Sequence, residues 1–319
     1  MIVERYYSSL TAVIGLILLV VLFVYIQPMI LSPFGVTLSA NQGTALALAA
    51  LAQLIVVLTG GVDLSVGAIV GLTNAIAATY MGTHPGIAAA VLIGTLAAGT
   101  LAGFVNGLVV AYGRIQPIIV TLATLYIFTG IGLVIRPQPG GLVPGGFADA
   151  LTRSWGYLPH ALVFLLAVVG LAWVPLMRSR LGRAIQAIGD NRNGAHVSGI
   201  SVARTELWAY TAGGFFAACA GIFLTAQTTS GDATIGASYT LNSVAAVVFG
   251  GAVLGGGRGV ALGPICGAYF LSLLISVLFA GGVSPFYQNL LLGAILVIVL
   301  AVANSWRLRT RHWLRVMSN

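Results

Sequence analysis

The chain is a series of long apolar runs separated by short polar or glycine-rich breaks. A helix that crosses a membrane needs about 20 apolar residues. The pattern predicts ten spans, at residues 8–30, 41–59, 62–80, 86–112, 116–135, 159–177, 206–228, 239–254, 260–281 and 286–303. The second, third and eighth are short or interrupted by glycine, so a bundle of eight spans stays an alternative. We expect an all-α integral membrane protein in which residues 1–319 form a single transmembrane domain.

Composition and charge support this prediction. Hydrophobic residues make up 59% of the chain and charged residues only 6%, whereas a soluble domain carries about 25% charge. All 14 basic residues are arginine, and nine of them follow the sixth or the tenth span: Arg178, Arg180, Arg183, Arg192, Arg204, Arg307, Arg309, Arg311 and Arg315. Because cytoplasmic loops are enriched in basic residues, both termini are predicted to be cytoplasmic. The net charge of +8 therefore indicates membrane topology and no nucleic-acid-binding face.

The lack of lysine limits the chemistry that this chain can perform. A phosphate-binding loop needs a lysine that reaches the terminal phosphates of ATP. If ATP and magnesium are used, another chain must bind them. The four histidines and two cysteines show no metal-ligand spacing. We expect no bound cofactor, no metal and no catalytic motif in this chain.

Two glycine-rich clusters, at residues 59–67 and 249–259, each lie between apolar runs. Glycine-interrupted segments at corresponding positions of two halves are typical of transporters with broken helices and internal repeats. We therefore expect broken or re-entrant helices at both clusters. An internal repeat that relates spans 1–4 to spans 7–10 is a further expectation.

Asp63, in the first cluster, is the only acid predicted to lie within or at the edge of the bilayer core. A charge at the bilayer centre costs at least about 2.5 kcal/mol, which favours a functional role such as a gate. Aspartate before an apolar run is also a common helix cap. The two interpretations are compatible, because transporters build gates from broken helices near the midplane.

The cytoplasmic loop 178–205 carries an apolar stripe at Leu181, Ala184, Ile185, Ala187 and Ile188. This spacing predicts one face of a short amphipathic helix. Gly189 then ends the helix, and residues 195–200 can form a second turn. A stripe on a cytoplasmic loop needs a surface to pack on, either a groove in a partner protein or the lipid surface.

Three stretches, at residues 60–67, 179–200 and 245–259, together resemble the transmembrane permease subunit of bacterial ATP-binding-cassette importers for monosaccharides of the ribose, xylose, arabinose and galactose type. The resemblance runs from about residue 40 to 303 and includes Asn106-Gly107, residues 115–122 and residues 284–288. The chain departs from the family at Asp190, where glycine is usual, and at His196, where a basic residue is usual. Asn242 stands where the family usually has an acid, which points to a different substrate or a specialised partner.

The resemblance implies an importer that moves a pentose or hexose from the periplasm to the cytoplasm across the bacterial inner membrane. Its other parts would be ATPase subunits that bind ATP and magnesium, a second identical or different permease chain, and a periplasmic sugar-binding protein docked on residues 136–158. The loop 178–205 would be the coupling helix, with Arg183 and Arg192 contacting the ATPase and Ile185 and Ile188 anchoring in its groove. The implied coupling residues are Arg183, Ile185, Ile188, Gly189, Arg192, Ser198 and Gly199.

Polar and small residues inside the spans are candidates for the translocation pathway and its gate. They are Gly60, Gly61, Asp63, Ser65, Gly67, Asn74, Asn106, Thr121, Asn242 and Gln288. Each of them could instead bind one helix to another. Two alternative functions stay open: a self-contained ion-coupled carrier with Asp63 as its protonation site, and an importer permease for a branched-chain amino acid or nucleoside.

Overall fold

The structure is a computed structural model that describes residues 2–297, except 83, 285, 288, 289, 292, 295 and 296. Seven segments of the described residues are long and apolar enough to cross a membrane. They lie in α1 (Ile2–Ile26), α2 (Pro33–Leu58), α4 (Pro85–Gly113), α5 (Pro117–Ile135), the continuous run α7, η2 and α8 (His160–Val168, Val169–Trp173, Val174–Arg178), α11 (Val202–Thr228) and α13 (Leu262–Ala280). Two shorter apolar helices are α3 (Val66–Tyr80) and α12 (Ala237–Phe249).

The all-α membrane architecture is confirmed. Each of the first nine predicted spans overlaps one of these helical segments. The predicted tenth span, 286–303, lies largely outside the described residues, so the count of ten and the sides of the two termini stay predictions. The remaining elements are η1 (Pro28–Leu31), α6 (Gly145–Thr152), a hairpin of β1 (Ser154–Trp155) and β2 (Leu158–Pro159), α9 (Arg180–Asp190) and α10 (Arg192–Val197).

Local sequence explains where the long helices begin. Pro33, Pro85 and Pro117 occupy the first turn of α2, α4 and α5, where a missing N–H costs nothing. Ser32 also caps α2, because its Oγ accepts a hydrogen bond from Gly35 N at 3.1 Å. The prolines and the Ser32 cap therefore mark where a new helix begins, so that consecutive helices stay separate at the turns between them.

Two helices form the centre of the bundle. The membrane-length windows of α2 and α11 are 89% and 83% buried inside the protein, against 17–28% for those of α1, α4, α5 and the α7–α8 run. Small residues let α4 approach α11 closely: Gly103 packs against the backbone of Gly214, as is typical of membrane helix pairs. The outer helices therefore present their apolar sides to lipid.

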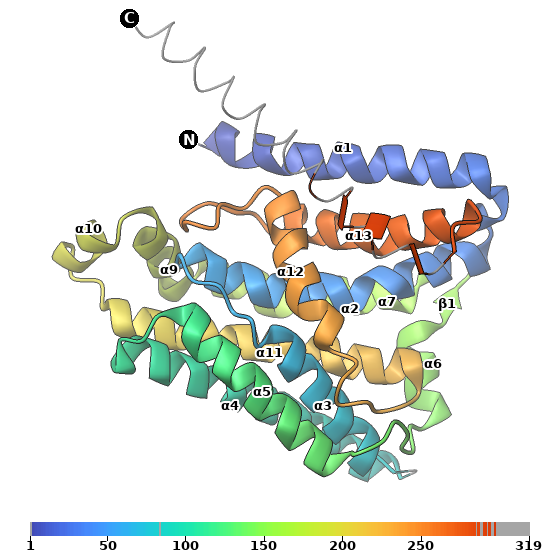
Figure 1. The fold of residues 1–319 in the computed structure, drawn as a ribbon, viewed down its shortest axis with the longest axis horizontal. Coiled ribbons are helices and arrows are strands. Elements are labelled where there is room, and N and C mark those ends of the chain that lie inside the picture. Colours follow the sequence, from blue (N-terminus) through green and yellow to red (C-terminus); the bar gives the residue numbers. More distant parts are fainter. Residues whose placement is uncertain are drawn as a thin grey trace, which may run out of the picture.

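The two ends of the bundle differ (Figure 1). One end carries the start of α1, α9, α10 and the loop 250–261, and the other carries η1, α6 and the β1–β2 hairpin. The arginine-rich loop 178–205 thus lies at one end, which we call the arginine-rich end. The hairpin end includes the predicted outer loop 136–158.

Candidate functional site

The first glycine cluster breaks the helical path between α2 and α3. Helix α2 ends at Leu58, α3 begins at Val66, and the backbone between them is irregular. Gly60 has a φ of 88°, a left-handed conformation that favours glycine. The predicted broken helix is present at this cluster.

Asp63 organises the start of α3. Its side chain is only 1% exposed, and its Oδ1 accepts hydrogen bonds from Ser65 N at 2.8 Å and Ser65 Oγ at 2.6 Å. The N-cap position itself is occupied by Ser65. Asp63 therefore braces the turn before the helix, and Ser65 holds the N-cap position that one of the two interpretations gave to Asp63. Its Oδ2 has no hydrogen-bond partner among the described residues.

Side chains from three other helices hold this irregular segment. With its amide oriented to satisfy both groups, Gln53 of α2 donates to Asp63 O at 2.7 Å and accepts from Asp63 N at 3.1 Å. Asn106 of α4 donates to Ser65 Oγ at 2.7 Å. Thr121 of α5 accepts from Leu64 N at 3.0 Å. Irregular backbone at membrane depth is tolerated only when such partners satisfy its polar groups.

Other predicted pathway residues lie elsewhere. Asn74 ties α3 to the end of α11 and to the loop after it. Its Nδ2 donates to Thr225 Oγ1 of α11 at 2.9 Å and to Ser230 O at 3.0 Å, and its Oδ1 accepts from Asp232 N at 2.7 Å. Gly67 packs against the backbone of Gly236 at the start of α12. Gln288 lies outside the described residues.

The second glycine cluster forms the loop 250–261 between α12 and α13. Gly256 and Gly257 have φ values of 96° and 74°. The loop folds back onto α2, where Gly257 N donates to Leu58 O at 3.0 Å. The two glycine clusters, almost 200 residues apart in the sequence, therefore meet at the end of α2.

Gly189, near the end of α9, completes this contact. A methyl group at Gly189 would overlap Leu58 O and the backbone of Gly256 and Gly257. Gly256 also packs against Gly60. We call these five residues, Leu58, Gly60, Gly189, Gly256 and Gly257, the glycine junction. It joins α9, the end of α2 and the loop 250–261 through backbone contacts.

The apolar stripe of α9 packs on the chain itself. Ile185 is 0% exposed and Ile188 is 2% exposed, and α9 contacts α2, α8 and α11. These two isoleucines were expected to anchor in an ATPase groove, and that expectation is corrected, because their side chains are already buried. The two isoleucines pack α9 against the bundle, and the glycine junction holds the C-terminal end of α9 in place.

Helix α10 offers an exposed surface at the arginine-rich end. Ser198 and Gly199 are exposed, and Val197 is 87% exposed. The sequence analysis did not single out Val197, although an apolar residue at a turn of a polar loop was a usable signal. In the segment 191–199, every residue except the buried Ala195 is exposed within the described chain.

The two arginines assigned to the ATPase also make contacts within the chain. Arg192 forms a two-pronged ion pair with Glu206 of α11, in which Arg192 Nη2 lies 3.1 Å from Glu206 Oε2. Glu206 is buried, whereas 59% of the Arg192 side chain is exposed. Arg183 donates from Nη1 to Arg178 O at 2.8 Å and is exposed. Arg192 therefore holds α10 to α11, and part of its side chain stays exposed to solvent.

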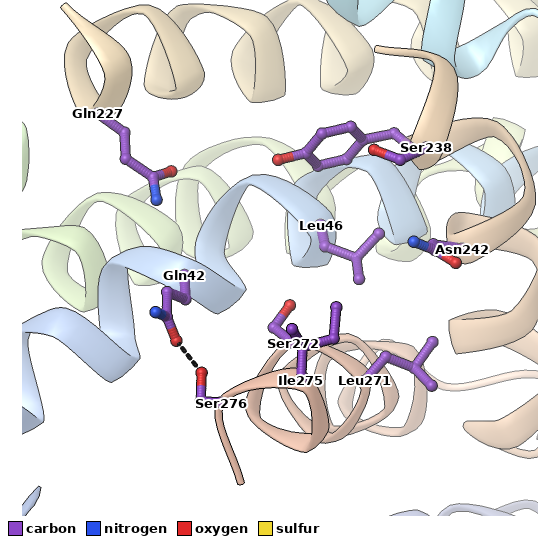
Figure 2. A pocket seen from close by; sticks show the side chains of 10 residues that line it. Gln42, Leu46, Gln227, Ser238, Asn242, Leu271, Ser272, Ile275 and Ser276 are labelled. Atoms are coloured by element: carbon purple, nitrogen blue, oxygen red, sulfur yellow. Dashed lines mark hydrogen bonds between the residues drawn. The ribbon is translucent and has the colours of Figure 1, made fainter. Parts of the chain in front are cut away.

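A polar groove of about 280 Å³ opens between α2, α11, α12 and α13 (Figure 2). Asn242 is the one predicted pathway residue that lines it. The other lining residues are Gln42, Leu46, Gln227, Ser238, Tyr239, Leu271, Ser272, Ile275 and Ser276. Ser276 Oγ donates to Gln42 Oε1 at 2.6 Å across the groove. Three amides and four hydroxyls thus gather here, and none of the described lining residues is charged.

The groove was largely missed in the sequence analysis. Gln42 and Gln227 lie at the ends of two predicted spans and Ser276 lies within a third, where a single polar residue more often joins two helices. Their convergence follows from the packing of helices distant in the sequence. The only available signal was their polarity inside predicted spans.

The geometry agrees with the comparisons to known proteins. The family of the branched-chain amino acid transport system permease component matches residues 35–300. The chain belongs to this permease family. The match covers α2 to α13 and both glycine clusters, so the broken helices and the α9–α10 loop are parts of a permease.

Several curated relatives are similar to this permease over most of its length. It is 36% identical to the ribose import permease protein RbsC of Bacillus subtilis over 90% of each chain. It is 35% identical to the RbsC protein of Escherichia coli K12, over 83% of this chain and 84% of the relative. It is 30% identical to the galactose/methyl galactoside import permease protein MglC of the same bacterium, over 90% and 91%. No solved structure matches the permease.

Proposed function

We propose that this permease is the membrane-spanning subunit of an ATP-binding-cassette importer that moves a monosaccharide, a pentose or a hexose, into the cytoplasm. The uncharged polar groove is the observation that carries this proposal. A sugar presents hydroxyls that both donate and accept hydrogen bonds, and amide and hydroxyl side chains complement both roles. Dispersed single contacts also suit transport, which requires release as well as binding.

The same groove argues against an amino acid as substrate, although the family description names branched-chain amino acids. A zwitterion entering low dielectric needs partners for both of its charges. The described lining of the groove offers none. The printed names of the relatives, which are ribose and galactose import permeases, support a sugar.

The drive for transport would come from ATPase subunits that hold ATP and magnesium, since the permease has no lysine for a phosphate-binding loop. They would dock on the exposed surface 191–199 and on Arg183. The seated helix α9 would carry their movement to the glycine junction. There it would shift the end of α2 and the loop 250–261 together, and with them both broken helices.

Two further partners would complete the importer in the bacterial inner membrane. The groove is not fully enclosed by the chain, and polar side chains at membrane depth are costly when they face lipid. A second permease chain would close it and share the pathway. A periplasmic sugar-binding protein would dock at the hairpin end, where Trp155 is exposed beside the Asp149–Arg153 ion pair.

An ion-coupled carrier with Asp63 as its protonation site is the alternative. Asp63 does not line the polar groove, and its Oδ1 is engaged by Ser65. These contacts favour a bracing role. The α9–α10 surface would also have no purpose in a carrier that works alone.

Affinity purification of the permease from its native membrane, followed by mass spectrometry, tests the proposal. We expect an ATPase subunit to co-purify with the wild-type chain. Arg183→Glu should reduce the amount of co-purified ATPase, whereas Arg153→Glu at the hairpin end should not. A wild-type permease that purifies alone and transports in vesicles under a proton gradient would overturn the proposal.

A further inference from the structure

Gln227 differs from every other polar residue in the described lining of the polar groove. It lies in the last turn of α11, and its Oε1 is buried without a hydrogen-bond partner among the described residues. No other side-chain oxygen or nitrogen in the described lining is both buried and unpartnered. Because a buried acceptor without a donor is costly, this oxygen points to a ligand that supplies the donor.

The backbone on both sides of Gln227 is held in place. Asn74 of α3 donates to Thr225 Oγ1 at 2.9 Å and to Ser230 O at 3.0 Å. These two hydrogen bonds tie the last turns of α11 and the loop after it to α3. A side chain on a rigid element is positioned more precisely than one on a loop. Gln227 is therefore placed to make a specific contact.

A second amide reaches the groove from α2. Ser276 Oγ of α13 donates to Gln42 Oε1 at 2.6 Å (Figure 2). This contact holds the amide oxygen toward Ser276, so the Nε2 group is the part of the Gln42 amide that can donate to a ligand. Figure 2 shows Gln42 and Gln227 at one end of the groove and Asn242 at the other. One end of the groove thus combines an acceptor on α11 with donors on α2.

This combination suits a hydroxyl group, which donates and accepts at once. Leu271 and Ile275 line the same groove and give the C–H groups of a sugar ring an apolar surface. A substrate without a hydroxyl at this end would leave Gln227 Oε1 unpaired. Sites built to hydrogen-bond a substrate hydroxyl reject analogues that lack it far more strongly than apolar pockets reject a missing methylene.

We propose that Gln227 determines which sugar the permease accepts, because its Oε1 accepts a hydrogen bond from one particular hydroxyl of the substrate. Gln42 donates to the sugar from the facing helix. This inference rests on the proposed function, since it takes the groove as the pathway of a sugar. A glutamine that only joined two helices would affect every sugar equally and would not distinguish one hydroxyl from another.

Uptake of monodeoxy sugars tests this role. The importer is reconstituted with its ATPase and binding protein, and initial uptake of the parent sugar, ribose or galactose, is compared at low concentration with that of each monodeoxy analogue. The binding protein is the same in every sample, so a change in the parent-to-analogue ratio between two permease variants belongs to the permease. Gln227→Met, which removes the acceptor at similar length, is the test variant. Gln27→Met is the matched control, because Gln27 is exposed and lies outside the groove.

We expect Gln227→Met to lower the parent-to-analogue ratio for one monodeoxy analogue by about 5–150-fold, the factor that corresponds to an unpaired buried acceptor. The ratios for the other analogues should stay at their wild-type values. Gln27→Met should keep every ratio. Gln227→Glu retains an acceptor and should also keep the ratio for the affected analogue, even if its uptake is slower.

Wild-type ratios at every position in Gln227→Met would overturn the role of Gln227, and so would loss of the discrimination in Gln227→Glu. Slower uptake of the parent sugar and of all analogues by one common factor leaves the ratios unchanged and would overturn it as well. These outcomes leave the proposed function intact, because the wild type still transports sugar. A wild-type importer that takes up neither ribose nor galactose would overturn the proposed function and this inference with it.

Discussion

Gly189 lies directly against the carbonyl oxygen of Leu58, so that α9 meets the end of α2 without an intervening side chain. The same carbonyl accepts a hydrogen bond from Gly257 N at 3.0 Å. One backbone group thus links the amphipathic helix of the loop 178–205 to both interrupted helices. This contact is the physical route by which movement of α9 would reach the pathway.

Replacing Gly189 by alanine should uncouple this route. A methyl group has no room at the junction, and overpacking of this kind costs about 1–3 kcal/mol. If this strain falls on one of two transport states, it shifts their balance about 5–150-fold. We expect sugar uptake to fall by a factor in this range while the variant still inserts into the membrane. Gly130→Ala, where a methyl group meets open space, is the matched control and should keep wild-type uptake.

Two substitutions of Asp63 separate bracing from gating. Asparagine keeps an Oδ1 that can accept from Ser65 N and Oγ, so Asp63→Asn should retain stability and transport. Asp63→Ala leaves the buried Ser65 N–H unpaired, which costs about 1–3 kcal/mol, and should lower the melting temperature in detergent. Loss of transport in a stable Asp63→Asn variant would instead show that the carboxylate charge is required.

The Arg192–Glu206 pair predicts a non-additive effect on stability. Arg192→Ala leaves the buried Glu206 carboxylate without its partner. The cost should be about 1–3 kcal/mol, below that of a fully buried pair because Arg192 is partly exposed. The double variant Arg192→Ala, Glu206→Gln should recover part of the lost stability. Thermal unfolding of the four proteins of this cycle measures the coupling, and additive losses would mean that the pair contributes nothing.

The polar groove predicts a specific effect on substrate. Asn242→Ala removes one amide from its lining, and one hydrogen bond contributes about 0.5–1.5 kcal/mol. The sugar concentration for half-maximal uptake should rise roughly 2–12-fold, with stability and ATPase co-purification unchanged. Leu241→Ala, the exposed neighbour outside the lining, should leave uptake unchanged. An equal effect of both substitutions would exclude the groove from the pathway.

The spans could be predicted because hydrophobic length and proline starts are local properties of the sequence. The glycine cluster around Gly60 likewise predicted the break between α2 and α3. The glycine junction could not be predicted, since Gly189 and Gly257 meet only after α2, α9 and the loop 250–261 have packed. The predicted internal repeat stays untested, because most of the last predicted span, 286–303, lies outside the described residues.

The apolar stripe of α9 shows a second limit. Ile185 and Ile188 indicated correctly that one face of this helix needs a packing surface. Periodicity cannot distinguish a surface on the same chain from one on a partner, and the chain's own helices provide it. The groove residues Gln42 and Ser276 show the same limit, because they come within 2.6 Å of each other only after α2 and α13 have packed.

Transport by the reconstituted system tests the central claim most directly. The permease is placed in proteoliposomes with its ATPase and binding protein, and uptake of labelled ribose and galactose is measured with and without ATP. The account predicts uptake of a sugar that requires ATP, the ATPase and the binding protein together. Equal uptake by the permease alone under a proton gradient, without ATP, would contradict it.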